Sequence, residues 1–299
     1  MSEYRWKRGY MVNSAIKLYE ADLHCHTTAS DGLLTPTELV HLAAELGLKG
    51  VGITDHDTIA GWKEAEEAGV DYQIRILRGI ELSTEWQGKE VHLLGYFVDE
   101  ASDYLNDQLR GLRKAREQRM LKILARLEAQ EIYISVGEVR KFVHGESIGR
   151  PHIAQALMER GYVKSISEGF DRYIGLGALA YVPRYKLTPQ EGINIIRGAN
   201  GVAVLAHPGV HRLECGIPEW VEMGLQGIEV LHSGHNPDDE KRYRAIAQQY
   251  NLLSTGGSDF HGEGIKAGVV LGGWGVPLDV LHQIHNLTQL NQKCPERNR

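Results

Sequence analysis

The stretch Gly50-Val51-Gly52-Ile53-Thr54-Asp55-His56-Asp57 combines the two features from which the fold and the site of this chain are predicted. Its first five residues form a short apolar run rich in β-branched side chains, which is typical of a buried parallel strand. Its last three residues place a histidine between two carboxylates where that strand should end. Similar apolar runs recur at residues 74–77, 201–205, 227–230 and 252–254.

Helix-start signals lie between these runs. Thr35-Pro36-Thr37-Glu38 offers an N-cap threonine, a proline at the first helical position and a glutamate that completes a capping box. Residues 188–191 and 237–240 start later helices in a similar way. Gln87-Gly88-Lys89 is a hairpin signal, so the strand at residues 90–98 is expected to pair with the strand before it. The alternation of strands and helices predicts an α/β fold with a parallel sheet, open or closed into a barrel.

The middle of the chain has a different pattern, with little strand signal and much charged helix. We predict a helical insertion there that covers the mouth of the site, and we interpret its charged run at residues 110–119 as a solvated helix face. The expected organisation is an N-terminal extension (1–18), a discontinuous barrel domain (19–101 and 185–290), the insertion (102–184) and a frayed tail (291–299).

Composition narrows the range of functions. The 299 residues, 42% of them hydrophobic, can bury the core of one barrel or of two smaller domains. The net charge of −6 does not suit a duplex-DNA binder, but a small nucleotide or a short RNA end could be bound by a few local arginines. Three cysteines give neither a disulfide framework nor a CxxC zinc site, which indicates a reducing cytoplasm. No membrane partner is expected, because the sequence has no long apolar run and no leader pattern. The oligomeric state stays open, and a monomer is compatible with the sequence.

Histidines and carboxylates follow the predicted strands in an ordered series. In His24-Cys25-His26 the two imidazoles share one face, because side chains alternate along an extended segment, and Cys25 is interpreted as a buried structural thiol. Asp259-Phe260-His261 repeats this alternation, and the two oxygens of Glu81 suit a bridging role between ions. The full set of candidate metal ligands is His24, His26, Asp31, His56, Glu81, His92, His207, Asp259 and His261.

The size and chemistry of this set predict the metal content. Nine candidates exceed the three protein ligands of a usual catalytic zinc site, so two or three divalent ions are expected. Mixed imidazole and carboxylate ligands favour Mn, Fe or Zn over Mg or Ca, which prefer oxygen. Manganese is the first choice, with Fe, Zn and Mg as alternatives. Asp57 is interpreted as the N-cap of a helix beginning at Thr58 and not as a ligand.

At these motifs the sequence resembles the PHP (polymerase and histidinol phosphatase) family of metal-dependent phosphoesterases. The resemblance extends from about Tyr19 to Gly275. It rests on the motifs DLHCH (22–26), ITDHD (53–57), GIE (79–81), HLLGY (92–96), LAHP (205–208) and GSDFH (257–261). It implies a distorted (β/α)7 barrel with a helical insertion and a trinuclear metal site at the C-terminal ends of the strands.

The resemblance also implies how the ligands divide among the ions. One ion would be held by His24, His26, Glu81 and Asp259, a second by Asp31, His56 and His261, and a third by Glu81, His92 and His207. Within this set, Asp31, His207 and His261 are expected to be catalytic. The cluster would bind phosphate oxygens and direct a metal-activated hydroxide at phosphorus. His232 and His235, after the strand at 227–230, are candidates for groups beside the ligands.

Within the family the chain is most similar to nucleotide phosphatases and RNA 5′-end exonucleases. These share a helical insertion with Gly149-Arg150-Pro151-His152-Ile153-Ala154 and a later Ala180-Tyr181-Val182-Pro183. The resemblance implies removal of the 3′-phosphate from nucleoside 3′,5′-bisphosphates, hydrolysis of short 5′-phosphorylated RNA, or both.

Two residues of the insertion are expected to bind substrate phosphate. The guanidinium of Arg150 could donate two hydrogen bonds to a phosphate that no metal binds, and Arg184 is a weaker candidate of the same type. His152 would assist if its segment is extended. The alternatives are a salt bridge from Arg150 to Glu146 or Glu159, and a packing role for His152.

Two other functions compete with this reading. A phosphatase for another small phosphomonoester, such as histidinol phosphate, would not need Arg150 to grip a second anionic group. A non-catalytic metal-bound module that scaffolds a polymerase would be expected to have lost ligands and to carry a polymerase domain. The complete ligand set argues against this module.

Overall fold

The structure, a computed structural model, describes residues 4–7, 10–13, 18–143, 145–183, 185, 187–266 and 268–293. Its main sheet has seven strands in chain order: β3 (Ala21–Cys25), β4 (Gly50–Ile53), β5 (Arg75–Trp86), β6 (Lys89–Tyr96), β7 (Val202–Leu205), β8 (Gly227–His232) and β9 (Leu253–Gly257). Neighbouring strands are parallel except for β5–β6 and β6–β7, so β6 alone in this sheet runs against the others. The predicted α/β fold is confirmed.

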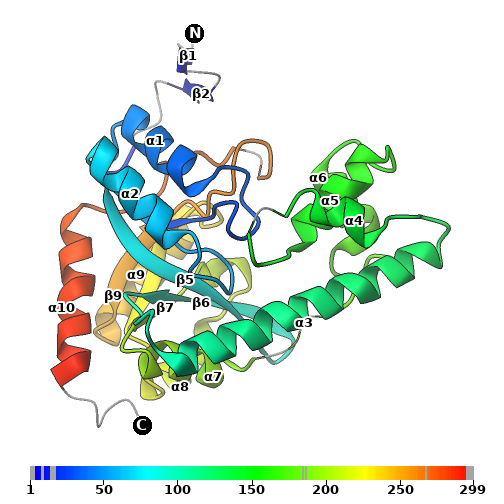
Figure 1. Cartoon of the computed structure of the whole chain (residues 1–299). Coiled ribbons are helices and arrows are strands. Elements are labelled where there is room, and N and C mark those ends of the chain that lie inside the picture. The colour runs from blue at the N-terminus through cyan, green and yellow to red at the C-terminus, as the bar shows by residue number, and fades with distance from the viewer. Residues whose placement is uncertain are drawn as a thin grey trace.

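The sheet is nearly closed into a barrel, because the chain that follows β9 lies against β3. The Asp259 amide donates to the His24 carbonyl at 2.9 Å, and the His26 amide donates to the Phe260 carbonyl at 2.8 Å. The helices that accompany the barrel are α1 (Pro36–Leu46), α2 (Trp62–Tyr72), α7 (Pro189–Gly198), α8 (Ile217–Glu222), α9 (Pro237–Gln249) and α10 (Asp279–Lys293). Figure 1 shows them on the outside of the sheet. The distorted barrel implied by the resemblance is therefore confirmed.

Local sequence signals explain where these elements begin. The Thr35 hydroxyl accepts from the Glu38 amide at 3.2 Å, and the Glu38 carboxylate accepts from the Thr35 amide at 2.8 Å, which is the predicted capping box of α1. The same box opens α7 at Thr188. The β5–β6 hairpin turns at Gln87 and Gly88, whose φ angles of 51° and 79° favour glycine. The predicted hairpin is confirmed.

Between β6 and α7 the chain leaves the barrel and forms a helical region. It consists of α3 (Asp103–Glu128), α4 (Val136–Arg140), α5 (Arg150–Glu159), α6 (Ile166–Gly169) and a π-helical turn (Phe170–Ile174). In Figure 1 the long α3 leads from the barrel to α4, α5 and α6, which lie to one side of it. A hydrophobic cluster formed only by residues between Met120 and Val182 holds this helical lobe together. The division of the chain into domains stays a prediction.

The chain ends differ in part from the prediction. Tyr4–Lys7 (β1) and Tyr10–Asn13 (β2) pair as antiparallel strands within the predicted N-terminal extension. The predicted frayed tail begins at Asn291, but α10 continues to Lys293, and the buried Asn291 side chain donates to the Gly201 carbonyl at 3.0 Å. His144, Arg184 and Cys294 lie outside the described residues. Two short 3-10 turns, Pro208–Val210 and Glu214–Gly216, follow β7.

Candidate active site

Side chains from six of the seven strands converge at one end of the barrel. Their donor atoms lie on or directly after β3, β4, β5, β6, β7 and β9, and Asp31 comes from the turn that follows β3. All nine predicted ligands are brought together, and eight of them are buried while His92 is partly exposed. Parallel strands deliver their carboxyl ends to one rim, which explains why ligands so distant in sequence meet.

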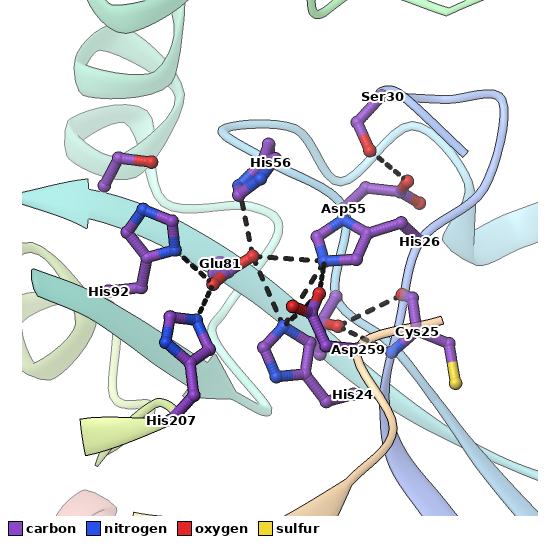
Figure 2. A network of polar contacts seen from close by, with 12 residues as sticks. His24, Cys25, His26, Ser30, Asp55, His56, Glu81, His92, His207 and Asp259 are labelled. Carbon is purple, nitrogen blue, oxygen red and sulfur yellow. Dashed lines mark hydrogen bonds and ion pairs between the residues drawn. The ribbon is translucent and has the colours of Figure 1, made fainter. Parts of the chain in front are cut away.

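Glu81 is at the centre of this cluster. Five imidazole nitrogens lie within 3.3 Å of its carboxylate oxygens: those of His24, His26 and His56 beside Oε2, and those of His92 and His207 beside Oε1 (Figure 2). A carboxylate that presents each oxygen to a different set of imidazoles has the geometry of a bridging ligand.

The donor atoms form four groups in which all atoms lie within 4.8 Å of one another. These groups are His24/His26/Glu81/Asp259, His26/Asp31/His56/His261, Glu81/His92/His207 and His24/Glu229/His232. The first three correspond to the three ion sites implied by the resemblance, with His26 added to the second. The fourth was not expected, and it contains Glu229, which sequence reasoning did not select.

Several buried polar atoms in this cluster form no hydrogen bond of good geometry with the described residues. They are His26 Nδ1, Asp31 Oδ1, His56 Nδ1 and Glu81 Oε2, which face one another at ion-pair distance, as His56 Nδ1 and Glu81 Oε2 do at 3.1 Å. Buried polar atoms that lack hydrogen bonds are destabilising, so several of them in one cluster need an explanation. Divalent cations placed among these nitrogens and oxygens would satisfy them, and the donor set therefore fits metal ions.

The carboxylates of the cluster are held in their ionised form. Burial by itself raises the pKa of Glu81, but the imidazoles of His56 and His92 outweigh it and hold that pKa well below its usual range. Burial also raises the pKa of Asp31, and His56 and His261 lower it well below its usual range. These ionised carboxylates create a field that favours positive charge.

The pKa values of the imidazoles depend on how close each ring lies to these carboxylates and how deeply it is buried. Burial lowers the pKa of His207 to about 4, so this ring is neutral, and burial also lowers the pKa of His56 well below its usual range. Burial also lowers the pKa of His26, but Asp259 and Glu81 more than compensate and raise it to about 9. A field that favours a proton on His26 favours a metal cation at the same place.

A cavity of about 600 Å³ opens above the cluster. Its floor includes His56, Glu81 and Asp259, and its walls carry the positive side chains of Arg116, Arg119, Arg150 and Lys266. Apolar side chains complete the walls: Ile166 and Phe170 from the helical lobe, and Ile265 and Val269 from the loop after β9. The cavity therefore combines a metal-ligand floor with cationic and apolar walls.

Arg150 lies at the start of α5 and lines this cavity. Its guanidinium carbon lies 5.1 Å from the centre of the Phe170 ring, and Nη1 donates to the Ile174 carbonyl at 3.4 Å. The two carboxylates with which Arg150 could form a salt bridge have other partners: Glu146 pairs with Arg113 at 3.5 Å, and Glu159 pairs with Lys141 at 3.3 Å. The guanidinium predicted to bind phosphate thus faces the site, held by the lobe and not by those carboxylates.

His152 has a different position from the one its predicted role requires. The segment is helical and not extended, and the His152 ring is buried. Its Nδ1 accepts from the Gly149 amide at 3.0 Å, which caps α5. His152 does not line the cavity. This geometry favours the packing alternative, in which His152 fixes the helix start that carries Arg150.

Two sequence interpretations are wrong at the junction between α3 and the barrel. Asp57 is not a helix N-cap, because α2 begins only at Trp62 and Asp57 has a φ of 54°. Its carboxylate accepts from Arg116 Nε at 2.5 Å instead. Arg116 belongs to the run at 110–119 that was interpreted as solvated, yet it is 7% exposed and lines the cavity. Nothing local in the sequence marks this pair, whose members are 59 residues apart.

The two remaining candidate histidines, His232 and His235, differ in whether their ring nitrogens are hydrogen-bonded. Both nitrogens of His235 are satisfied, since Nδ1 donates to the Val230 carbonyl at 2.9 Å and Nε2 accepts from the Gly209 amide at 3.0 Å. His235 is therefore structural. His232 lines the cavity, and its Nε2 has no hydrogen-bond partner among the described residues. Cys25 is a buried member of the main hydrophobic core cluster, as strand alternation predicts.

Comparison with known proteins identifies the family. A family model described as PHP domain matches residues 22–193. A 5′-3′ exoribonuclease of Haemophilus influenzae is 35% identical over 248 residues, which cover 80% of this chain and 89% of that protein. A 3′,5′-nucleoside bisphosphate phosphatase of Chromobacterium violaceum is 35% identical over 249 residues, which cover 81% of this chain and 87% of that protein.

Comparison with solved structures also supports this family. A crystal structure from Bifidobacterium adolescentis, described as a proposed metal-dependent phosphoesterase, has a TM-score of 0.85 and 35% sequence identity. The match covers 90% of this chain and 96% of that one. Among the helices that the structure describes, none is long and apolar enough to cross a membrane.

Proposed function

This chain belongs to the PHP domain family, and from that premise we propose that it is a metal-dependent phosphoesterase that hydrolyses nucleotide phosphoesters. The substrates are the 3′-phosphate of nucleoside 3′,5′-bisphosphates, the 5′ end of short phosphorylated RNA, or both. The observation that carries the proposal is the cluster of nine ligands, with its buried atoms that lack hydrogen bonds, beneath a cavity lined by Arg150.

The ligand assignment follows the three groups of donor atoms. The residues that would hold two or three divalent ions, with manganese as the first choice, are His24, His26, Asp31, His56, Glu81, His92, His207, Asp259 and His261. When bound, such ions supply Lewis acidity toward phosphate oxygens and an activated water. Among the nine, Asp31, His207 and His261 are proposed from the family resemblance to be catalytic as well, and their position on the lining of the cavity is compatible with that role.

The side chains of the cavity would place the substrate. Arg150 donates to the phosphate that is not hydrolysed, with His152 holding the helix start beneath it. Phe170 and Ile265 offer apolar contact to a nucleoside and keep water from that wall of the cavity. Neutral His207 and ionised Asp31 lie on the floor below, where they orient the group under attack.

Two relatives with equal identity to this chain support different substrates, since one is named an exoribonuclease and the other a bisphosphate phosphatase. The substrate is proposed to be small or single-stranded, not duplex DNA, because the cationic residues near the site lie inside the cavity. Action in the cytoplasm as a monomer is proposed from the sequence alone.

One experiment tests the proposal and chooses between the substrates. Manganese-loaded protein is given adenosine 3′,5′-bisphosphate and a short 5′-phosphorylated RNA in parallel, with histidinol phosphate as a third substrate. Release of phosphate or nucleotide that chelation stops would support the proposal, and the ratio of kcat/KM values would rank the substrates. Turnover of histidinol phosphate alone would favour the competing phosphatase. Metal binding without turnover of any of the three would refute the proposal.

A further inference from the structure

Strand β8 is the one strand of the main sheet that supplies none of the nine ligands. It nevertheless places Glu229, which is 0% exposed, directly against the cluster. A buried carboxylate is costly unless hydrogen bonds or opposite charges compensate for its lost hydration. The partners of Glu229 therefore show what it does.

Glu229 contacts two different ligands of the cluster. Its Oε1 and Oε2 lie 3.3 Å and 3.4 Å from His24 Nδ1, and Oε2 accepts from the His207 backbone amide at 2.8 Å. His24 and His207 belong to different groups of donor atoms, and the only residue those two groups share is Glu81. One carboxylate thus holds one ligand of each group.

The contact with His24 determines which nitrogen of that ring faces the cluster. A neutral imidazole donates from one nitrogen and accepts at the other. With Nδ1–H donated to Glu229, the lone pair is on Nε2, which lies 3.3 Å from Glu81 Oε2 and 3.5 Å from Asp259 Oδ1. The metal-facing tautomer of His24 is therefore the one that Glu229 selects.

The contact with His207 acts on the backbone. His207 has φ 27° and ψ 53°, a left-handed conformation that is unfavourable for a residue with a side chain. The hydrogen bond from its amide to Glu229 stabilises that conformation, and the conformation turns Nε2 toward Glu81 at 3.1 Å.

A bulge in β8 makes room for a second inward-facing group. Glu229 pairs with Thr255 and Leu231 with Gly256, so Val230 is an extra residue. The bulge brings His232, three residues after Glu229, to the same face. Gly234 donates its amide to His232 Nδ1 at 2.9 Å, so Nε2 of the neutral ring carries hydrogen and lies 3.7 Å from Asp259 Oδ2. In this arrangement His232 Nε2 has no free lone pair, and both oxygens of Glu229 are turned to His24 Nδ1 and the His207 amide.

We propose that Glu229 is a positioning residue that couples two metal subsites, by fixing the tautomer of His24 in one and the backbone of His207 in the other. The inference rests on the proposed metal site but not on the identity of the substrate. Glu229→Gln keeps one acceptor oxygen and replaces the other with a donor NH₂. The two contacts must then share one oxygen, or His24 must accept from the NH₂ in its other tautomer, so the tautomer of His24 is no longer fixed.

The test is direct titration of metal-free protein with Mn²⁺, following free Mn²⁺ by electron paramagnetic resonance. Glu229→Gln is expected to weaken Mn²⁺ binding by about 10- to 100-fold, with the full number of ions restored at high Mn²⁺. Two further backgrounds separate the subsites, because His207→Ala leaves the His24 group intact and His24→Ala leaves the His207 group intact. Adding Glu229→Gln is expected to weaken the remaining binding in both backgrounds.

Glu214→Gln is the matched control. Glu214 is also a carboxylate outside the nine ligands, but it accepts from the Tyr243 hydroxyl at 2.9 Å and from Arg242 at 3.1 Å, and neither of these partners is a ligand of the cluster. This variant should lower the melting temperature of the metal-free protein while leaving the Mn²⁺ affinity unchanged. If Glu229→Gln does not fold, Glu229→Asp keeps the charge, withdraws the oxygens by one methylene and should weaken binding in the same direction.

Three results would overturn the inference. The first is wild-type Mn²⁺ affinity in the Glu229 variants, and the second is weakening in only one of the two backgrounds. The third is loss of an ion that saturating Mn²⁺ does not restore, which would make Glu229 a direct ligand. A wild-type protein that binds Mn²⁺ but cleaves no phosphoester would refute the proposed function and leave this test valid.

Discussion

At the scale of single residues, the site depends on carboxylates that are expensive to bury unless cations lie beside them. Asp259 illustrates this. Its Oδ1 lies 3.2 Å from His26 Nε2, and its Oδ2 pairs with Lys266. Burial raises the pKa of Asp259, but Lys266 and His24 outweigh it and hold that pKa well below its usual range, so the carboxylate is available as a ligand.

Asp259→Ala is therefore expected to abolish turnover, because it removes a ligand and leaves His24 and His26 with only Glu81 as a shared carboxylate partner. The measurement is phosphate release at saturating Mn²⁺. Asp107→Ala is the control, since Asp107 is an exposed carboxylate on α3 that pairs with Arg110. Near-normal turnover by the Asp259 variant would show that the metal assignment is wrong.

Arg150→Ala should act on KM. Loss of a charge-assisted hydrogen bond of about 1.5–3 kcal/mol would raise KM about 10- to 100-fold for substrates with a second phosphate. Hydrolysis of p-nitrophenyl phosphate, which has no second phosphate, should change little. Arg160→Ala, just beyond the other end of α5, is the control, because Arg160 pairs with Glu138 away from the cavity. An equal loss on both kinds of substrate would contradict the role of Arg150.

At the scale of elements, α3 joins the barrel to the helical lobe. Its Leu105, Leu109 and Leu112 pack in the main core, and the buried ion pair of Arg116 and Asp57 attaches it to the rim. Strands and helix starts of this chain could be predicted because their signals are local, as in the capping box at Thr35 and the hairpin at Gln87-Gly88. The pairing of Arg116 with Asp57 could not be predicted, because the sequence of an amphipathic helix does not show which distant carboxylate its arginine contacts. For that reason the sequence of residues 110–119 predicts a solvent-exposed helix face.

Arg116→Ala should consequently destabilise the protein by about 3–5 kcal/mol, since it leaves the Asp57 carboxylate buried and unpaired. Arg110→Ala on the same helix should cost at most about 1 kcal/mol, because its pair with Asp107 is exposed. Urea unfolding of both variants measures the difference. Similar stabilities for the two would mean that α3 is not fastened by this pair.

The start of α4 should be sensitive to acid. Hydrogen bonds from Ser135 and the neighbouring Arg160 lower the pKa of Glu138 from 4.5 to about 2. Because the folded-state pKa is depressed, the stabilisation is present above about pH 4.5 and is lost as the pH falls toward 2. The protection factors of α4 amides against hydrogen exchange, measured relative to the intrinsic rate at each pH, should therefore fall over that range in the wild-type protein. Glu138→Gln should show lowered protection factors already at neutral pH, and wild-type protection factors that do not change with acid would contradict this.

At the scale of the whole molecule, the barrel gathers residues that are far apart in sequence around one point. The nine ligands could be selected from the sequence because each lies on a strand or in the loop after one, close to a recognisable motif. Glu229 is a lone carboxylate in the apolar run at 227–230. It could not be selected from the sequence, because its partner His24 is 205 residues away. The cationic and apolar walls of the cavity likewise arise only when the lobe and the β9 loop meet the rim.

The central claim is that metal ions at this cluster are required for hydrolysis of nucleotide phosphoesters. The most direct measurement is phosphate release from adenosine 3′,5′-bisphosphate by chelator-stripped protein as Mn²⁺ is restored, with bound Mn²⁺ per chain measured in the same samples. Activity should be absent in the stripped protein and rise with bound Mn²⁺ until the cluster is full. Full activity in the stripped protein, or none in the loaded protein on this substrate and on 5′-phosphorylated RNA, would contradict the account.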